Sequence, residues 1–288
     1  MLTKNHGVKM ESFFASAERS NDKELNIEIE TISNNPVISG LLNSIGGLLA
    51  ILDENRQIIS LNDSFLKFLC IDEPETALGL RPGEALECVH ANDDPAGCGT
   101  TKFCSTCGAA VAIVTSLEQE IYSEKLCALS ANRGGKNVDI VLLVKSQPIK
   151  IENKTFILLF VQDVTRQEQR AALERTFYHD INNLISMLVQ ASEFLIEDYP
   201  SELSDTIYGS SFRLFKEVSI QKSLSEHSST SYQPKWNEYT IAKILQELQF
   251  FFKNHPTANK RHIHFSERNK DCILKTDLCL LSRVLCNM

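Results

Sequence analysis

Hydrophobic residues change their spacing near residue 166, and this change divides the chain into two regions. Before it, short apolar runs alternate with polar turns, which is the pattern of strands. These runs cover residues 47–52, 57–61, 138–144 (with an extension past Pro148) and 156–161. Residues 65–70 form a predicted short helix between them. Two strands, helices and two further strands predict an α+β domain over residues 37–165, after a helical lead-in over residues 1–36.

From residue 166 the apolar positions follow a helical period. Phe177, Ile181, Leu184, Leu188, Ala191 and Leu195 are spaced 4, 3, 4, 3 and 4 residues apart. This heptad stripe predicts a helix of about 30 residues. Pro200 interrupts the pattern, and a second helix is predicted over residues 202–226. Because two antiparallel helices bury little surface alone, the hairpin predicts a dimeric four-helix bundle over residues 166–227.

The last part of the chain has the pattern of the beginning of another α/β domain, over residues 237–288. A linker over residues 227–236 precedes it. Helices are predicted over residues 239–252 and from residue 277 onward, with strands at 261–265 and 272–274. The last helical pattern is still in progress at Met288, so we expect the chain to be a truncated product.

Composition and charge exclude several classes of protein. Hydrophobic residues make up 43% and charged residues 23% of the 288 residues, which is ordinary for a globular protein. A net charge of −8 without a basic block argues against nucleic-acid binding. The sequence offers neither a membrane-spanning run nor the apolar core of a signal peptide. We therefore expect a soluble cytoplasmic protein with no membrane partner.

Four cysteines and a histidine are concentrated in the segment 88–108. Cys88, Cys98, Cys104 and Cys107 follow the spacing Cys-x9-Cys-x5-Cys-x2-Cys, and His90 lies among them. In a reducing compartment, such clustering favours metal ligands or redox groups over structural disulfides. The Cys-x2-Cys spacing lets two thiolates bind one metal, and His90 is a further candidate ligand.

Three interpretations of the cysteine segment remain open. A structural zinc site would use four of the five groups, and an iron–sulfur cluster would use the four cysteines. A metal-free thiol switch would cycle between Cys104 and Cys107. The other five cysteines are predicted to be small buried hydrophobic residues rather than ligands. They are Cys70, Cys127, Cys272, Cys279 and Cys286.

His179, on the predicted first helix of the hairpin, has side chains suited to phosphoryl chemistry around it. With Phe177, Ile181 and Leu184 in the core, His179 and Asp180 fall on the exposed flank. The Asp180 carboxylate can accept the Nδ1 proton, which leaves Nε2 as a nucleophile. Asn183 lies one turn further along on the same face.

The pattern Phe-x-His-Asp-x-x-Asn-x-Leu at residues 177–184 resembles the H-box of sensor histidine kinases of two-component systems. The resemblance covers residues 166–288 and implies that His179 is the phosphoacceptor, Asp180 the general base and Asn183 an orienting or phosphatase residue. It also implies a homodimer, ATP and magnesium as cofactors of the full-length protein, and a response-regulator receiver domain as partner. Residues 277–288 resemble the start of the family's N-box helix. Its magnesium-binding asparagine and the glycine-rich ATP boxes would lie beyond Met288, so this chain is not expected to phosphorylate itself.

Residues 37–165 resemble a PAS domain. The resemblance rests on residues 52–65 and on residues 161–165, where an Asp-x-Thr motif joins the last strand to a following helix. It implies that a redox or metal signal at the cysteine segment passes through Asp163 and Thr165 into the His179 helix. Three alternative interpretations remain open: a metal-binding PAS dimer without catalysis, a phosphoacceptor lacking its own ATP site, and a zinc-stabilised scaffold.

Overall fold

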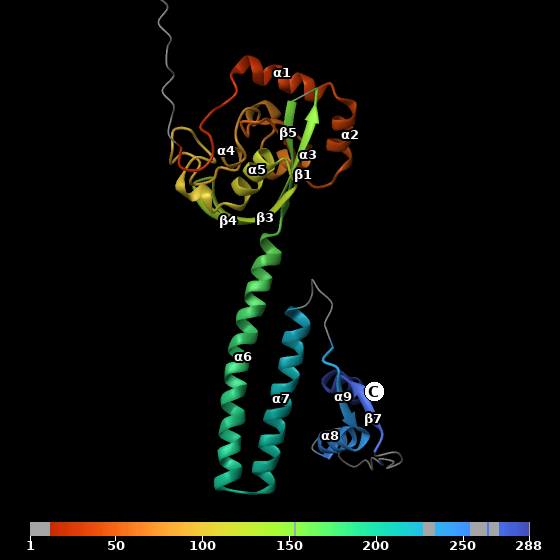
Figure 1. Cartoon of the computed structure of the whole chain (residues 1–288). Coiled ribbons are helices and arrows are strands. Elements are labelled where there is room, and N and C mark those ends of the chain that lie inside the picture. The colour runs from red at the N-terminus through yellow and green to blue at the C-terminus, as the bar shows by residue number, and fades with distance from the viewer. Residues whose placement is uncertain (1–11, 153, 227–233, 254–263, 265–270, 288) are drawn as a thin grey trace, which may run out of the picture. The chain divides into compact units, whose positions relative to one another are not determined.

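The computed structural model describes residues 12–152, 154–226, 234–253, 264 and 271–287. The chain divides into two compact units, residues 1–169 and 170–288 (Figure 1). The described part of the first unit contains five strands and five α-helices before the long helix α6 begins. The strands are β1 (Leu48–Leu52), β2 (Ile58–Leu61), β3 (Ser123–Arg133), β4 (Lys136–Ile151) and β5 (Lys154–Asp163). The helices are α1 (Asp22–Ser33), α2 (Pro36–Ser44), α3 (Asp63–Leu69), α4 (Pro82–Ala85) and α5 (Gly108–Gln119), with 3-10 turns at Pro74–Thr76 and Lys102–Ser105.

The five strands form one antiparallel sheet in the order β2-β1-β5-β4-β3. The central strand β5 pairs with β1 on one side and with β4 on the other, so the first and last predicted strand pairs meet in the middle. This mixed architecture, with an antiparallel sheet and helices, agrees with the predicted α+β class. The predicted strands 47–52, 57–61 and 156–161 correspond to β1, β2 and β5, and β4 continues past Pro148 as predicted.

Each face of the sheet carries its own hydrophobic core. The larger core includes Phe65, Leu86 and Ile113 from the segments between β2 and β3, packed with Leu142 and Ile157 of the sheet. The smaller core lies on the other face. Its members are Ile32, Ile38, Ile51, Ile59 and Phe156, from α1, α2 and the sheet. The segment that carries the cysteines therefore lies on the side of the larger core.

The lead-in is an integral part of the first unit. Helix α1 starts with a capping box at Asn21 and Glu24, and its residue Ile32 is 1% exposed. Before it, Phe13 N–H donates to Thr100 O at 2.8 Å and Ala15 N–H donates to Gly99 O at 3.0 Å. The predicted boundary at residue 36 is therefore a helix start, with Asn35 as the N-cap and Pro36 in the first turn of α2.

Helix α6 (Thr165–Asp198) begins directly after β5, and the side chains of Asp163 and Thr165 hold its start by hydrogen bonds. Asp163 Oδ1 accepts hydrogen bonds from the backbone N–H of Thr165 at 2.9 Å and from its hydroxyl at 2.5 Å. The Thr165 hydroxyl oxygen accepts the N–H of Val141 in β4 at 2.9 Å. The first helical turn is therefore tied to the sheet by side-chain hydrogen bonds.

We expect Thr165→Val to lower the free energy of unfolding by about 1–2 kcal/mol, because the N–H of Val141 loses its acceptor and the Asp163 carboxylate loses a donor. Thr176→Val is the matched control, since its hydroxyl donates to Ala172 O on an exposed helix surface and should change stability little. Thermal unfolding of the two variants followed by circular dichroism measures the difference. Equal losses of stability in the two variants would contradict a structural role of the Thr165 hydrogen bonds.

The second unit contains a helical hairpin and a C-terminal α/β part. The hairpin consists of most of α6 and of α7 (Glu202–Glu226), with the predicted break at Pro200 between them. The C-terminal part contains β6 (Asn237–Thr240), α8 (Ile241–Lys253), β7 (Ile273–Thr276) and α9 (Leu278–Asn287), with β6 antiparallel to β7. Most of the predicted strand 261–265 lies outside the described residues. Among the described helices, none combines the length and apolar character needed to cross a membrane.

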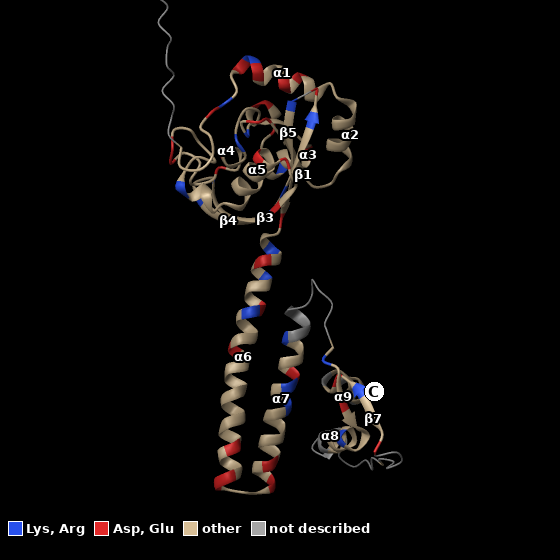
Figure 2. Ribbon diagram, in the orientation of Figure 1, with Lys and Arg blue, Asp and Glu red and all other residues tan. Residues whose placement is uncertain are grey.

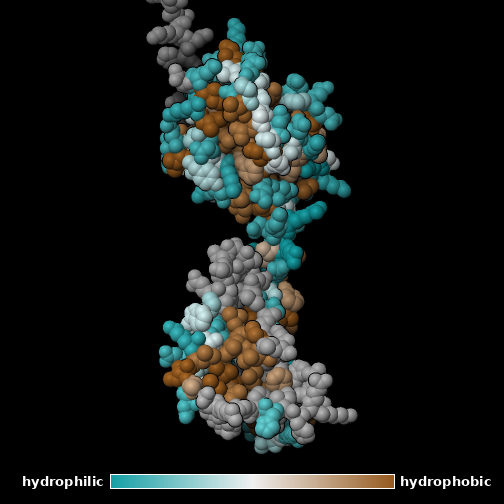
Figure 3. Space-filling model, turned by 90° about the vertical axis from the view of Figure 1, so that its right-hand side faces the viewer, coloured by the Kyte–Doolittle hydropathy of each residue, from teal (hydrophilic) through white to brown (hydrophobic). Residues whose placement is uncertain are grey.

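The predicted heptad stripe is mostly exposed within one chain. Phe177 and Leu184 are each 59% exposed and Leu188 is 46% exposed, whereas Ile185, one position further along, is 5% exposed. Helix α6 therefore carries two neighbouring stripes. We call the exposed one the outer stripe; it consists of Phe177, Leu184, Leu188, Ala191 and Leu195. Figure 3 shows broad hydrophobic areas on the visible surface of the second unit.

Candidate functional site

His179 projects from the middle of α6 into solvent. Its side chain is 72% exposed and that of Asp180 is 67% exposed. His179 Nδ1 lies 3.1 Å from Asp180 Oδ1 and 3.5 Å from Asn183 Nδ2. The helix thus brings together the three residues that the sequence predicted, because positions 179 and 183 are one turn apart.

The contact with Asp180 decides which nitrogen of His179 can react. A carboxylate only accepts hydrogen bonds, so Asp180 favours the tautomer with the proton on Nδ1. The lone pair then lies on Nε2, which is a nucleophile on an exposed face of the helix. Asn183 offers an amide beside the same ring and can hold an oxygen of an incoming group.

The charged residues of α6 lie before residue 181 and after residue 192, and they include Arg175 and Asp180 close to His179 in sequence. Figure 2 shows acidic residues at the end of the hairpin where α6 and α7 join. They are Glu193, Glu197, Asp198, Glu202 and Asp205. Residues 181–192 of α6 carry no charge. An uncharged middle segment leaves the outer stripe free of groups that would resist burial.

The second candidate site is a cavity of about 230 Å³ in the first unit. Its lining includes Cys88, Cys98, Cys104, Cys107 and His90, so the structure gathers all five predicted groups around one space. Cys104 lies in the 3-10 turn Lys102–Ser105, and Cys107 is the N-cap of α5. Within the described part of the chain, however, no three His, Cys, Asp or Glu side chains are placed to hold one metal ion.

The four thiols have different environments. Burial raises the pKa of the Cys88 thiol, and burial together with the nearby Cys104 raises that of Cys98 to about 12. The Cys104 Sγ lies 3.3 Å from both the N–H of Gly99 and the hydroxyl of Thr101. A hydrogen bond from Cys127 lowers the pKa of Cys107 to about 6, and the same contact raises that of Cys127.

Cys127 is a neighbour of Cys107 that the sequence did not reveal. It is 0% exposed in β3, as expected for a small buried residue, but its Sγ lies 3.6 Å from Cys107 Sγ. Twenty residues separate the two cysteines in sequence, and only the packing of α5 on β3 brings them together. A Cβ on Gly108 would come within 2.1 Å of Leu126 O, so glycine is required for this close approach.

Four other cysteines were predicted to be small buried residues. The prediction is wrong for two of them, and the side chains of the other two lie outside the described residues. Cys70 and Cys272 are exposed rather than buried. Cys70 ends α3 in a left-handed conformation, with φ of 58°, which directs it away from the core. The side chains of Cys279 and Cys286 lie outside the described residues.

His90 lines the cavity but is already engaged by two neighbours. Its ring stacks on Phe103, with 3.8 Å between the ring centroids. Its Nδ1 lies 2.7 Å from Asp93 Oδ2. A carboxylate on one ring nitrogen is the usual support of a metal-bound histidine, so His90 keeps its place among the candidate ligands.

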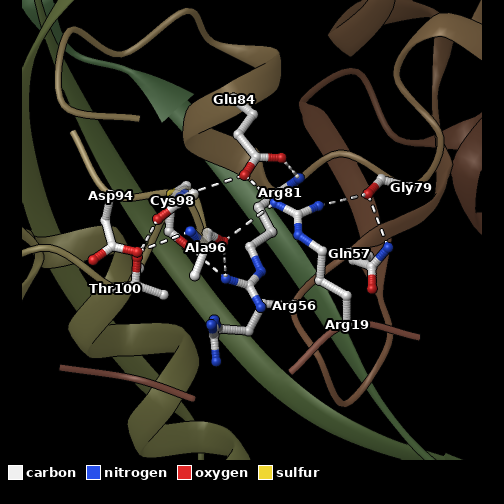
Figure 4. A network of polar contacts seen from close by, with 12 residues as sticks. Arg19, Arg56, Gln57, Gly79, Arg81, Glu84, Asp94, Ala96, Cys98 and Thr100 are labelled. Carbon is white, nitrogen blue, oxygen red and sulfur yellow. Dashed lines mark hydrogen bonds and ion pairs between the residues drawn. The ribbon is translucent and has the colours of Figure 1, made fainter. Parts of the chain in front are cut away.

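Beside the cavity, a buried guanidinium connects three segments of the chain (Figure 4). Arg81 is 0% exposed, and its side chain donates to backbone carbonyl groups only. The acceptors are Ser16 O at 3.4 Å, Glu18 O at 2.6 Å, Asn55 O at 3.1 Å, Ala96 O at 3.0 Å and Cys98 O at 3.1 Å. Burial lowers the pKa of Arg81 to about 10. Arg81 therefore links the N-terminal segment to the loop that carries Cys98.

A second buried guanidinium, Arg56, lines the cavity itself. It is 6% exposed and takes a left-handed conformation with φ of 67°. One of its nitrogens donates to Ser16 O at 2.6 Å, while its buried Nε has no hydrogen-bond partner. Sequence analysis missed both arginines, because an isolated arginine in an α/β segment has the same pattern as a surface residue.

A comparison with protein-family models and with curated proteins gives no match. Solved structures similar to this chain include several PAS domains. One belongs to a two-component sensor histidine kinase, at 11% identity, covering 49% of this chain and 99% of that chain with a TM-score of 0.29. Another is the PAS domain of nitrogen regulation protein NR(II) from Vibrio parahaemolyticus, at 12% identity, 45% and 99% coverage and a TM-score of 0.32. A third is from an HTR-like protein of Haloarcula marismortui, at 16% identity, 49% and 98% coverage and a TM-score of 0.30.

Proposed function

We propose that this chain is the sensory and phosphoacceptor part of a cytoplasmic two-component histidine kinase. The first unit acts as a PAS-type sensor, and the hairpin presents His179 for phosphorylation. The observation that carries this proposal is the exposed group of His179, Asp180 and Asn183, with 3.1 Å between the imidazole Nδ1 and the carboxylate. Such a group places a nucleophilic nitrogen in solvent and fixes its tautomer.

In the proposed reaction, Nε2 of His179 attacks the γ-phosphorus of ATP, so that an N–P bond forms while the bond to the ADP oxygen breaks. Asp180 accepts the Nδ1 proton and stabilises the positive charge that develops on the ring. Magnesium and ATP would be held by a complete ATP-binding domain, which residues 237–288 begin. The phosphoryl group then passes to an aspartate of a receiver domain, and Asn183 orients the incoming group.

The outer stripe supports a homodimer as the working form. It presents large apolar side chains of one helix face to solvent, and monomeric proteins seldom expose such continuous faces. A second copy packing on this stripe would complete a four-helix bundle. His179 lies outside the stripe and would stay accessible in the dimer.

Signals from the sensor have a direct physical route to His179. The cavity lies on the α5 side of the sheet, and β4 is tied to the start of α6 through Thr165. Movement of β4 would therefore change the start of the helix that carries His179, and a bundle can respond by moving between discrete packings.

The purified chain is expected to become phosphorylated on His179 when it is incubated with phosphoramidate, a small donor that needs no ATP site. The product should be acid-labile phosphohistidine, measured by phosphorus NMR and by peptide mass spectrometry. His179→Gln should abolish the modification of this peptide, and Asp180→Asn should slow it by about 100-fold because the Nδ1 proton loses its acceptor.

His90→Gln is the matched control, because His90 also pairs with a neighbouring aspartate but lies outside the hairpin. It should leave the phosphorylation of residues 170–198 unchanged. Modification of all histidines at one rate, or an undiminished rate in Asp180→Asn, would contradict the proposed role of this site.

A further inference from the structure

The cavity is larger than a single metal ion, and much of its wall is apolar. Its thiols lie around a space of about 230 Å³, and they share the walls with apolar side chains such as Leu86, Ala110 and Ile113. A tetrahedral zinc site needs its thiolates to converge within about 2.3 Å of one point. Apolar walls also offer water few hydrogen-bond partners. The space therefore fits a polyatomic group that thiolates can bind from several sides.

The buried guanidinium groups around the cavity favour an anion as that group. Arg56 is buried in its wall, with Nε unpaired, and Arg81 lies beside it with only carbonyl oxygens as partners. The nearby carboxylates are already engaged. Glu84 accepts from Arg19 and from the N–H groups of Arg81 and Cys98. Asp53 accepts from the Ser20 hydroxyl and the Gln57 N–H. A buried cation without a charged partner is costly, so an anion in the cavity would stabilise Arg56.

Two of the sulfurs already have the contacts that support a cluster-bound thiolate. Cys104 Sγ is 3.3 Å from the Gly99 N–H, and Cys107 Sγ is 3.6 Å from the thiol of Cys127. Hydrogen bonds to ligand sulfur stabilise the thiolate and raise the reduction potential of iron–sulfur clusters.

We propose that the cavity binds a [4Fe–4S] cluster through Cys88, Cys98, Cys104 and Cys107, with Arg56 as its buried counter-charge and Cys127 as a donor to the Cys107 sulfur. With four thiolates, an oxidised cubane cluster has a net charge of about −2, which the two guanidinium groups balance. The inference deepens the sensory half of the proposed function. Its chemistry does not involve His179, so the two proposals can fail separately.

Two glycines next to the site, Gly83 in α4 and Gly99 in the Cys98 loop, provide a second prediction. A Cβ on Gly83 would lie 2.5 Å from Cys98 Sγ, and a Cβ on Gly99 would lie 3.1 Å from Arg56 Nε. Gly83→Ala should therefore displace one cluster ligand and lower the bound iron at least tenfold. Gly40→Ala is the matched control, because a Cβ there meets nothing within 4 Å.

The test is anaerobic reconstitution of the full chain with ferrous iron and sulfide, with a parallel sample given zinc alone. We expect about four iron and four sulfide per chain and a broad absorption band at about 400 nm that weakens on reduction. Ala variants of each of the four cysteine ligands should lose at least nine-tenths of the iron, whereas Cys70→Ala, at an exposed cysteine, should lose none. Far-UV circular dichroism of each variant against the metal-free wild type shows whether the fold is kept.

Further variants separate this proposal from its competitors. His90→Ala should retain the cluster, and Cys127→Ala should retain it with a lower reduction potential, because a donor to ligand sulfur is lost. Tight binding of one zinc in place of iron and sulfide, or no metal bound at all, would overturn the assignment. Loss of iron in His90→Ala would overturn the all-cysteine ligand set. His179→Gln should bind the cluster normally, whatever its phosphorylation shows.

Discussion

Replacing Arg81 by methionine is expected to destabilise the first unit by about 3–5 kcal/mol. Methionine fills a similar volume but donates no hydrogen bonds, so carbonyl groups of the N-terminal segment, the β1–β2 turn and the Cys98 loop all lose a donor. Each buried carbonyl that is left unpaired costs about 1–3 kcal/mol, and partial solvation by water limits the sum. Arg81→Lys should be intermediate, because one ammonium with three donors cannot reach three separate segments.

Calorimetric unfolding of the full chain measures this effect. Arg133→Met is the matched control. Arg133 is half-buried, donates to the single carbonyl of Phe68 at 3.1 Å and stacks on the same ring, so it should cost about 1 kcal/mol. Equal losses in the two variants would show that Arg81 does not hold the three segments together. A selective loss of protection from proteolysis in residues 12–20 would show that it does.

If the chain dimerises through the outer stripe as proposed, replacing Leu188 by glutamate is expected to convert the dimer into monomers at micromolar concentration. Leu188 belongs to the outer stripe and is 46% exposed in one chain, so a second copy would bury its remaining surface. Because a two-fold interface contains each residue twice, the variant introduces two carboxylates into an apolar contact. At about 1.5–3 kcal/mol per lost leucine contact, the dissociation constant should rise at least 100-fold.

Sedimentation equilibrium over a range of concentrations gives the dissociation constants. Gln190→Glu is the matched control, because it adds the same charge two residues away on an exposed position outside the stripe. It should leave the dimer intact. A wild-type chain that is monomeric at all concentrations, or a Gln190→Glu variant as weak as Leu188→Glu, would contradict dimerisation through the outer stripe.

Strands and helices with strong periodicity could be predicted from the sequence. The apolar runs at β1 and β5 are buried on both faces of the sheet, so they appear as continuous hydrophobic segments. Helix α7 begins and ends at the predicted residues, because Pro200 and the loss of periodicity mark its limits. Strand β3 was missed, since its buried residues Ser123, Cys127 and Ala131 are small and do not form a hydrophobic pattern.

The heptad spacing predicted helix α6. It could not decide which side of the helix packs within the chain and which side would pack against a second copy. Apolar residues occur at neighbouring positions of α6, such as Leu184 and Ile185, and these neighbours point to different sides of the helix. Only the structure shows that Ile185 is buried within one chain while Leu184 and Leu188 stay exposed. The periodicity of apolar residues in a sequence does not distinguish a contact within one chain from a contact between two copies, because both bury the same kind of side chain.

The groups that carry the candidate chemistry could be found from the sequence. His179, Asp180 and Asn183 are close because one helical turn connects them, and helical geometry follows from local sequence. The spacing of Cys88, Cys98, Cys104 and Cys107 in one short segment likewise marked the cavity. The surroundings of these groups depend on tertiary packing. Arg56 and Arg81 reach the cavity from the β1–β2 turn and the start of α4, and Cys127 of β3 contacts Cys107 in its wall. Side chains so far apart in sequence meet only when the sheet and its helices pack.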